Sequence, residues 1–313
     1  MATERVGQSA KRTGLGAILG IVLSVTVLAG TATAEDPLFL NWAELTPGLT
    51  AGYDPTSANE CKSGKINCVD SVIREMTKRF DRLAGSCDHN AIFSLTYLRT
   101  TEEYRRATST AGFFADPAFV NHEDAVFARY YFDPYDAWAA GRRSQVPQAW
   151  LIAFDAARDR EVSASGNVLL GLNAHINRDL PYVLSGIGLR APDGSSRKSD
   201  HDKVNTFLNR VADTLFPEIA RRFDPTVDDN DLPGTYDDLL TFQAVAVMRE
   251  SAWRNAERLA DARTGLERML VEQSIETYAT REALAIKAAT AYLPGSGGSA
   301  ARDAHCALHH DDA

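Results

Sequence analysis

The chain has 313 residues, of which 44% are hydrophobic and 24% are charged, so it is long enough to bury a substantial core. Its 42 acidic residues outnumber its 33 basic residues, which gives a formal net charge of −9 at pH 7. Binding to a nucleic-acid backbone depends on clustered Lys and Arg, and because the sequence contains no such cluster, nucleic acid is not an expected partner.

Residues 1–34 have the three parts of an export signal. Lys11 and Arg12 supply positive charge, residues 14–30 are uncharged and mostly apolar, and residues 32–34 (Ala-Thr-Ala) are the small residues that a signal peptidase reads. We therefore expect cleavage at the end of this segment and a secreted mature chain. The apolar run is at the lower limit of the length that spans a bilayer, so an uncleaved membrane anchor is the alternative. No later run approaches that length.

All four cysteines lie after this segment, which is the pattern of disulfide-bonded cysteines in an exported protein. The short spacing of Cys61 and Cys68 favours a bridge between them, and this leaves Cys87 to pair with Cys306. The second bridge would close most of the mature chain into one loop and tie its end to its first half. A free Cys306 is the alternative.

Residues 35–65 contain Pro37, Pro47 and Pro55 with little periodicity, so we expect an irregular segment. From Val69 onward, hydrophobic residues recur at three- and four-residue steps, which predicts helices. The predicted helices cover about residues 69–83, 88–106, 116–132, 135–141, 147–160, 165–185 (with a bend at Pro181), 200–223, 236–262 and 265–292.

No stretch alternates between apolar and polar residues as a strand does. The predicted fold class is therefore all-α, with one helical domain of about eight helices over residues 66–293. Residues 294–313 begin with a Gly- and Ser-rich stretch, which predicts a flexible tail tethered by a disulfide at Cys306.

The segment 169–184 (LLGLNAHINRDLPYVL) contains the strongest candidate site. Residues four apart lie one above the other on a helix. His175 and Asp179 have this spacing at one edge of the apolar face, and Asn173 and Asn177 have it at the other. An imidazole and a carboxylate at this step can bind one divalent ion such as Zn²⁺. A His–Asp hydrogen bond inside the core is the alternative.

Two other helices supply further candidate ligands. His201 shares a stripe with Asn205 and is expected to face inward, and its place near a helix N-terminus disfavours the protonated ring. Asp124 lies on an apolar stripe with Phe127, so it must meet a cation, a metal or several donors. His122 is on another side of that helix and is expected to be exposed.

Each of these candidates has a structural alternative. His201 could act only as a capping residue in the first turn of its helix. Asp124 could form a buried salt bridge, for which Arg178 and Arg249 are the candidate partners.

The core motif N-A-H-I-N-x-D-L-P spans residues 173–181, and TYLRTTEEY, NHEDAVFARYYF, DHDKVNTFLN and RESAWRNA accompany it. With these motifs, nearly all of the mature chain resembles the actinobacterial domain of unknown function 5995 family, in a secreted, cysteine-containing subgroup. The resemblance implies an all-helical fold and no particular substrate. It marks as motif positions Asn173, His175, Asn177, Asp179, His201 and Asn205.

Three functional hypotheses follow. The first is an exported metal-dependent hydrolase, in which the ion activates a water molecule. Its predicted metal ligands are His175, Asp179, His201 and Asp124. Residues expected to orient these ligands or the substrate are Asn173, Asn177, Asn205 and Arg178.

The other two hypotheses need no metal. One is a non-catalytic secreted binding or cell-envelope protein, in which the same polar residues form a buried hydrogen-bond network. The other is a pocket for a small apolar or lipid-like ligand. The aromatic residues expected to line that pocket are Phe127, Tyr130, Tyr131, Trp150 and Trp253.

Overall fold

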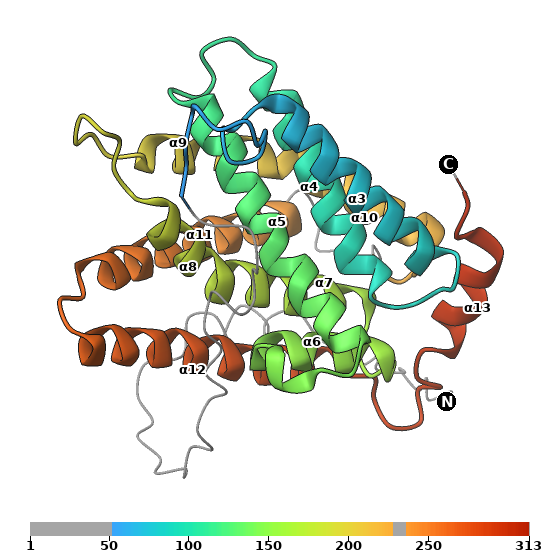
Figure 1. The fold of residues 1–313 in the computed structure, drawn as a ribbon. Helices are drawn as coiled ribbons and strands as arrows, with labels where there is room; N and C mark the ends of the chain where they lie inside the picture. The colour runs from blue at the N-terminus through green and yellow to red at the C-terminus, as the bar shows by residue number, and fades with distance from the viewer. Residues whose placement is uncertain (1–51, 228–235, 313) are drawn as a thin grey trace, which may run out of the picture. The chain divides into compact units, whose positions relative to one another are not determined.

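The computed structural model describes residues 52–227 and 236–312, so the predicted export signal and most of the irregular lead-in lie outside the described residues. In these two ranges the regular secondary structure consists of helices, with no strand, and this confirms the predicted all-α fold class (Figure 1). None of the described helices combines the length and the apolar character needed to cross a membrane.

The first two described helices, α3 (Ile66–Ala84) and α4 (Ala91–Thr108), pack against each other (Figure 1). On α3, Val72, Met76 and Phe80 recur at four-residue steps and are all buried, so one stripe of this helix faces the core. The first half of α4 is buried on every side. Consequently α4 is an interior helix, and its side chains can line an internal site.

Helix α5 (Pro117–Ala139) begins with a side-chain cap, because the Asp116 carboxylate accepts from the Phe119 N–H at 3.1 Å. It then continues through Pro134, so the predicted division into two helices was wrong. A proline inside a helix removes a backbone hydrogen bond. Packing of the neighbouring Tyr135 ring on Phe154, with centroids 5.3 Å apart, helps to hold the helix together across this position.

After α6 (Gln148–Arg158), a continuous helical stretch contains α7 (Ala164–Leu172), the π-helix η2 (Asn173–Asp179) and α8 (Leu180–Ile187). The sequence pattern predicts one regular helix here with a bend at Pro181. The irregularity instead precedes the proline, as a wider turn whose residues are all buried. Short π-helical turns often occur at functional sites.

The remaining helices are α9 (Lys198–Lys203), α10 (Asn205–Arg222), α11 (Tyr236–Asp261), α12 (Gly265–Thr290) and α13 (Ala300–His309). Helix α11 packs mainly on α8, and α12 packs on α6 and η2. The segment predicted to be a flexible tail thus contains the helix α13, which its Gly- and Ser-rich beginning concealed.

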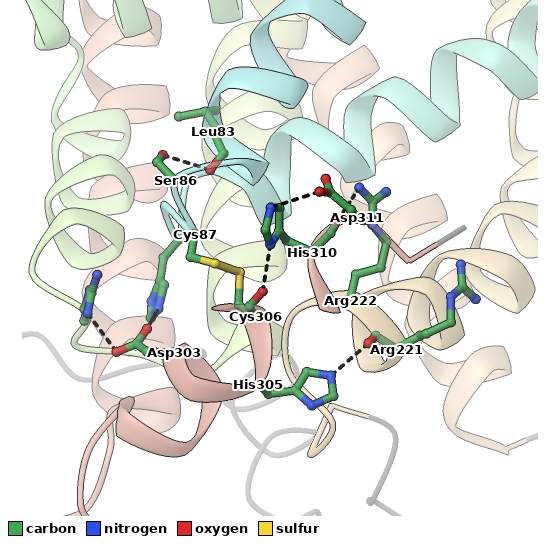
Figure 2. The surroundings of a disulfide bond; sticks show 12 residues. Leu83, Ser86, Cys87, Arg221, Arg222, Asp303, His305, Cys306, His310 and Asp311 are labelled. Atoms are coloured by element: carbon green, nitrogen blue, oxygen red, sulfur yellow. Dashed lines mark hydrogen bonds and ion pairs between the residues drawn. A yellow bond between two sulfur atoms is a disulfide. The ribbon is translucent and has the colours of Figure 1, made fainter. Parts of the chain in front are cut away.

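Two disulfides join the predicted pairs, Cys61–Cys68 and Cys87–Cys306. The second bridge ties α13 to the turn after α3 (Figure 2). At the same junction, His89 Nε2 lies 2.8 Å from Asp303 Oδ1. The end of the chain is therefore held by a covalent bond and by polar contacts.

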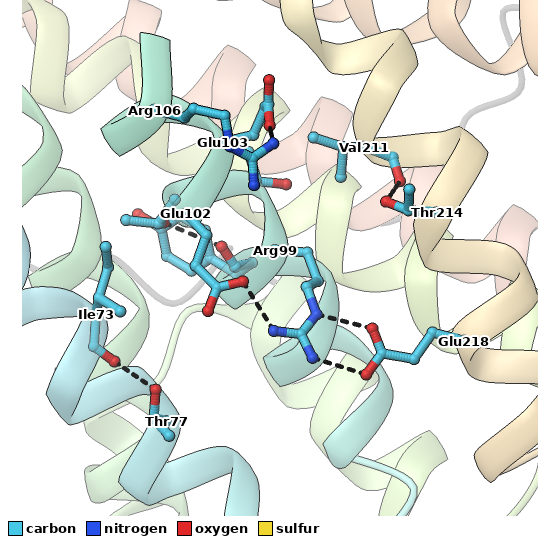
Figure 3. A network of polar contacts seen from close by, with 12 residues as sticks. Ile73, Thr77, Arg99, Glu102, Glu103, Arg106, Val211, Thr214 and Glu218 are labelled. Atoms are coloured by element: carbon cyan, nitrogen blue, oxygen red, sulfur yellow. Dashed lines mark hydrogen bonds and ion pairs between the residues drawn. The ribbon is translucent and has the colours of Figure 1, made fainter. Parts of the chain in front are cut away.

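An ion pair joins α4 to α10. Arg99 donates from Nε and Nη2 to both carboxylate oxygens of Glu218, at 2.7 Å each, and from Nη1 to Glu102 at 2.8 Å (Figure 3). A bidentate pair sets the orientation of both side chains as well as their distance. It therefore helps to align α4 and α10, which form two walls of the cavity described next.

Candidate functional site

A cavity of about 150 Å³ lies between α4, α5, α7, η2, α10 and α11. This is about ten times the volume that one water molecule needs. Its wall on α4 extends from Phe93 to Tyr104, which corresponds to about 16 Å at a rise of 1.5 Å per residue. Its apolar and aromatic lining includes Phe93, Tyr97, Tyr104, Val120, Phe127, Val168, Leu172, Ile176, Leu180, Phe207, Val211, Leu215, Phe216 and Val245.

The cavity forms where two parts of the hydrophobic core meet. Phe93 and Leu215 belong to the main core cluster, whereas Val120 and Phe207 belong to a smaller one. Helix α10 carries residues of both clusters, and the Arg99–Glu218 pair joins it to α4.

His175 and Asp179, predicted as a pair on one helix, are in contact in η2, where His175 Nδ1 lies 3.2 Å from Asp179 Oδ2. Asp179 also accepts from Trp150 Nε1 at 2.8 Å and from Arg178 Nη1 at 2.9 Å. A carboxylate beside Nδ1 favours the tautomer that has its proton there and leaves Nε2 as an acceptor. Burial lowers the pKa of His175, so the ring is neutral at pH 7.

The His175 ring forms part of the cavity wall. The Phe127 ring stacks on one of its faces, and the Tyr97 ring makes an edge contact with centroids 4.5 Å apart. Its Nε2 atom is buried and has no hydrogen-bond partner among the described residues. A neutral imidazole held in this way can accept a hydrogen bond or a proton from a bound molecule.

Two adjacent carboxyl groups of α5, Glu123 and Asp124, also line the cavity. Both keep part of their surface open, yet they lie deep among apolar groups, and this burial raises the pKa of Glu123 to about 7 and that of Asp124 to about 8. Oδ2 of Asp124 has no hydrogen-bond partner in the described ranges. In its neutral form, such a carboxyl can donate a hydrogen bond to a ligand.

Asp124 does not form the salt bridge that the sequence analysis offered as an alternative. Arg178 pairs with Asp179 and with Glu276, at 2.9 and 2.8 Å. Arg249 donates to Asn205 Oδ1 at 2.8 Å. Both candidate partners thus bind other groups.

His201 is buried, as its helical stripe predicts, but it contacts α11 instead of lining the cavity. Its Nε2 lies 3.3 Å from the carbonyl oxygen of Arg249, and its Nδ1 lies 3.2 Å from Arg249 Nη2. Burial, together with the nearby Arg249 charge, lowers the pKa of His201 well below its usual value. Both ring nitrogens are therefore occupied by contacts with one residue.

The four predicted metal ligands do not come together. His175 and Asp179 contact each other, Asp124 faces the cavity, and His201 lies against the Arg249 guanidinium, whose positive charge opposes a second cation. In the part of the chain that the structure describes, no three His, Cys, Asp or Glu side chains form a group that could hold a metal ion. The geometry thus gives no support to a shared ion at these residues.

The side chains predicted to orient such an ion instead connect η2 to α12. Asn173 donates to the Ala279 carbonyl at 2.8 Å, and Asn177 donates to Asn173 Oδ1 at 2.9 Å. Arg178 donates from Nε to Glu276 at 2.8 Å. These bonds form a buried network that holds the π-helical turn in place.

The aromatic residues predicted to line a pocket are distributed over several sites. Of the five, Phe127 reaches the large cavity, whereas Tyr131 and Trp150 line a separate space of about 10 Å³. Trp253 packs in the cluster between α8 and α11, and Tyr130 packs in another. Helical periodicity predicts that these rings are buried, but it does not predict which cavity or core cluster each ring contacts.

Two further side chains lie in places that the sequence did not predict. His122, expected to be exposed, is fully buried, and its Nδ1 lies 2.9 Å from the Cys61 carbonyl oxygen. Arg249 lines the cavity, although the sequence analysis considered it only as a partner for Asp124. Its position four residues from both Val245 and Trp253 on α11 was an available signal, because it places a charge on an apolar stripe.

The fold and the cavity define an all-α protein with an internal, largely apolar pocket that contains a neutral imidazole and two carboxyl groups. The chain belongs to the Family of unknown function (DUF5995), whose model matches residues 69–289 and so includes every residue of the cavity wall. Neither a curated protein nor a solved structure matches the chain.

Proposed function

We propose that the protein binds a small apolar or lipid-like molecule in the cavity between α4, α5 and α10. The observation that supports this is the size of a cavity whose wall is mostly apolar. Apolar wall atoms that face open space lack the packing contacts that such atoms make elsewhere in the core. A bound molecule would supply these contacts.

Hydrolysis of the bound molecule is a second candidate, because His175 has the arrangement of a general base. Nε2 would take a proton from water as the water oxygen adds to an ester carbonyl carbon, and would return that proton to the departing alcohol oxygen. Asp179 would stabilise the protonated ring. A His175→Gln variant that still binds the ester but no longer cleaves it would support this step, and full activity in that variant would exclude it.

We also infer that the protein acts outside the cytosol. The two disulfides are typical of chains that mature in an oxidising compartment. The sequence pattern of residues 1–34 would direct export, with an uncleaved anchor as the alternative. Sequencing the N-terminus of the protein recovered from the culture medium tests this inference, and an intact N-terminus on a cytosolic protein would contradict it.

Ligand binding is tested by thermal unfolding of the mature chain with a neutral apolar probe, dodecanol. A ligand at one hundred times its Kd stabilises by about 2.7 kcal/mol, which for a domain of this size raises Tm by about 5–10 °C. Ala212→Phe, which places a ring in the cavity, should abolish the shift. Thr214→Phe, on the exposed side of the same helix, should retain it. An unchanged Tm with the wild-type chain would contradict the proposal.

A further inference from the structure

We propose that the ligand is an anionic amphiphile, a hydrocarbon chain ending in a carboxylate, with its head group bound by Arg249. This inference rests on the proposed function, because it names the class of molecule that the apolar cavity accepts. It follows from the contacts of Arg249, from the charges around the cavity and from the distribution of polar groups along it.

Arg249 is a buried cation that has no carboxylate within 4.0 Å among the described residues, and Glu123 and Asp202 act on its charge only from a greater distance. Its side chain lines the cavity and the residue is only 6% exposed. Its hydrogen bonds go to neutral groups, namely Asn205 Oδ1 at 2.8 Å and the His201 carbonyl at 2.7 Å. No hydrogen bond within the described ranges uses Nη1. Burying an unpaired charge is costly, so an anion at this position would stabilise the site.

The two other buried arginines of the described residues, Arg178 and Arg302, each lie beside a carboxylate. Arg178 binds the carboxylates of Asp179 and Glu276. Arg302 lies 3.8 Å from Asp224. Among the buried arginines that the structure describes, Arg249 differs from these two because no carboxylate lies within 4.0 Å of it. It is also the one that lines the large cavity, so its missing partner can be a ligand.

The charges around the cavity favour an anion over a cation. Burial lowers the pKa of Arg249 to about 10, so the guanidinium remains charged at neutral pH. The rings of His175 and His201 are neutral. The pKa of Glu123 is raised to about 7 and that of Asp124 to about 8, so at about pH 6 both carboxyls are mostly protonated. The cavity then carries positive charge, and a protonated carboxyl can donate to the ligand head group.

The polar groups also leave one end of the cavity free for a hydrocarbon chain. Arg249 lies against the start of α10 through its bond to Asn205. The α10 wall continues from Val204 to Phe216, which corresponds to about 18 Å. The α10 residues that line the cavity over this length, from Phe207 to Phe216, are all apolar. A ligand with its head at Arg249 would therefore place its chain along α10.

The test compares three probes with one chain length, dodecanoate, dodecanol and dodecylammonium, each titrated calorimetrically at pH 6 below its micelle concentration. We expect dodecanoate to bind about 10- to 100-fold more tightly than dodecanol, as for a hydrogen bond to a charged group. Arg249→Gln should remove that preference and leave dodecanol binding within about twofold. Arg254→Gln, an exposed arginine of the same helix, is the matched control and should bind as the wild type does.

A second variant keeps the test decisive if Arg249→Gln fails to fold. In the wild type, the affinity for dodecanoate should fall as the pH rises through about 7, because Glu123 becomes charged beside the ligand. The groups that influence Glu123 are Arg249, Asp200 and Arg197, with Asp124 adjacent. Glu123→Gln, which is neutral and similar in shape, should weaken this pH dependence.

The outcomes separate the two proposals. If dodecanol binds and dodecanoate binds no more tightly, the head-group inference is wrong and the proposed function stands. If dodecylammonium binds best, the carboxyl groups determine the specificity, and Arg249 has been assigned the wrong role. If none of the three probes binds, the proposed function itself fails.

Discussion

The rings of His175 and Phe127 lie face to face, with centroids 3.5 Å apart and planes 3° from parallel. This stack joins η2 to α5 at the cavity wall, and Asp179 holds the other edge of the imidazole. His175 is consequently a packing residue and a polar group of the pocket at once, and replacing it should affect both properties.

We expect His175→Ala to lower the free energy of unfolding by about 2–4 kcal/mol, because it creates space in the core and removes one contact of a buried carboxylate. Urea denaturation measures this loss. His309→Ala, at a half-exposed position of α13, should change stability by less than about 0.5 kcal/mol. A chelator should leave the wild-type curve unchanged. If it instead reproduced the effect of His175→Ala, the shared-metal hypothesis would be restored.

The raised pKa of Asp124 predicts how stability depends on pH. The folded-state pKa of about 8 lies above the ordinary value of 3.8 for an aspartate, so the folded protein holds the proton more tightly. Its contribution to stability is complete below about pH 4 and is lost as the pH rises towards 8. Asp124→Asn should therefore be more stable than the wild type at pH 8 and show a flatter profile of Tm against pH.

The exposed Asp213→Asn is the control for this measurement and should follow the wild-type profile. Glu123 should also lose its contribution to stability as the pH rises, and because its pKa is about 7, this loss should be complete at a lower pH than for Asp124. An Asp124→Asn variant that loses stability equally at pH 5 and pH 8 would show that the carboxyl is charged and paired in the folded state.

The two disulfides should contribute unequally to stability. Cys87–Cys306 closes a loop with a sequence separation of 219, whereas Cys61–Cys68 closes one of 7. In the chain-entropy description these loops correspond to about 5 and about 2 kcal/mol. Replacing both cysteines of each pair by serine and comparing urea midpoints tests this order. Equal midpoints would mean that α13 separates from the rest of the domain before the main unfolding transition.

A close contact between α7 and α4 predicts a link between stability and the pocket. A Cβ atom on Gly171 would overlap the ring of Phe93, which lines the cavity. Gly171→Ala should cost about 1–3 kcal/mol by overpacking, and should weaken binding of dodecanol if Phe93 moves into the cavity. Gly265→Ala is the control, because a Cβ there meets nothing within 4 Å. Unchanged stability in Gly171→Ala would contradict the close packing.

Much of the secondary structure was predictable because a helix leaves a local signature. The spacing of Val72, Met76 and Phe80 marks the buried stripe of α3, and Asp116 marks the start of α5. Where prediction was wrong, distant contacts decided the outcome. Helix α5 continues through Pro134, and the chain after the Gly- and Ser-rich stretch forms α13, which the Cys87–Cys306 bridge ties to α3.

In the candidate site, too, a local contact was predictable and the other contacts were not. The four-residue step predicted that His175 and Asp179 meet, and they do, because their contact lies within one helical turn. The step could not show that Trp150 and Arg178 already occupy the Asp179 carboxylate, or that Arg249 covers His201. Trp150 and Arg249 belong to other elements. Arg178 directly precedes Asp179 in η2, but adjacent residues on a helix do not normally face each other, so the spacing gave no sign of this contact.

By itself, then, the sequence indicated the all-α class, favoured the cysteine pairs and marked many of the residues that lie on buried stripes. Only the tertiary structure decided which buried groups face one another. It also decided that Asp124 and His175 line one cavity, each with a polar atom that has no hydrogen-bond partner among the described residues. The physical reason is that helical periodicity depends on neighbours three and four residues away. A cavity, by contrast, depends on how the surfaces of several helices fit together.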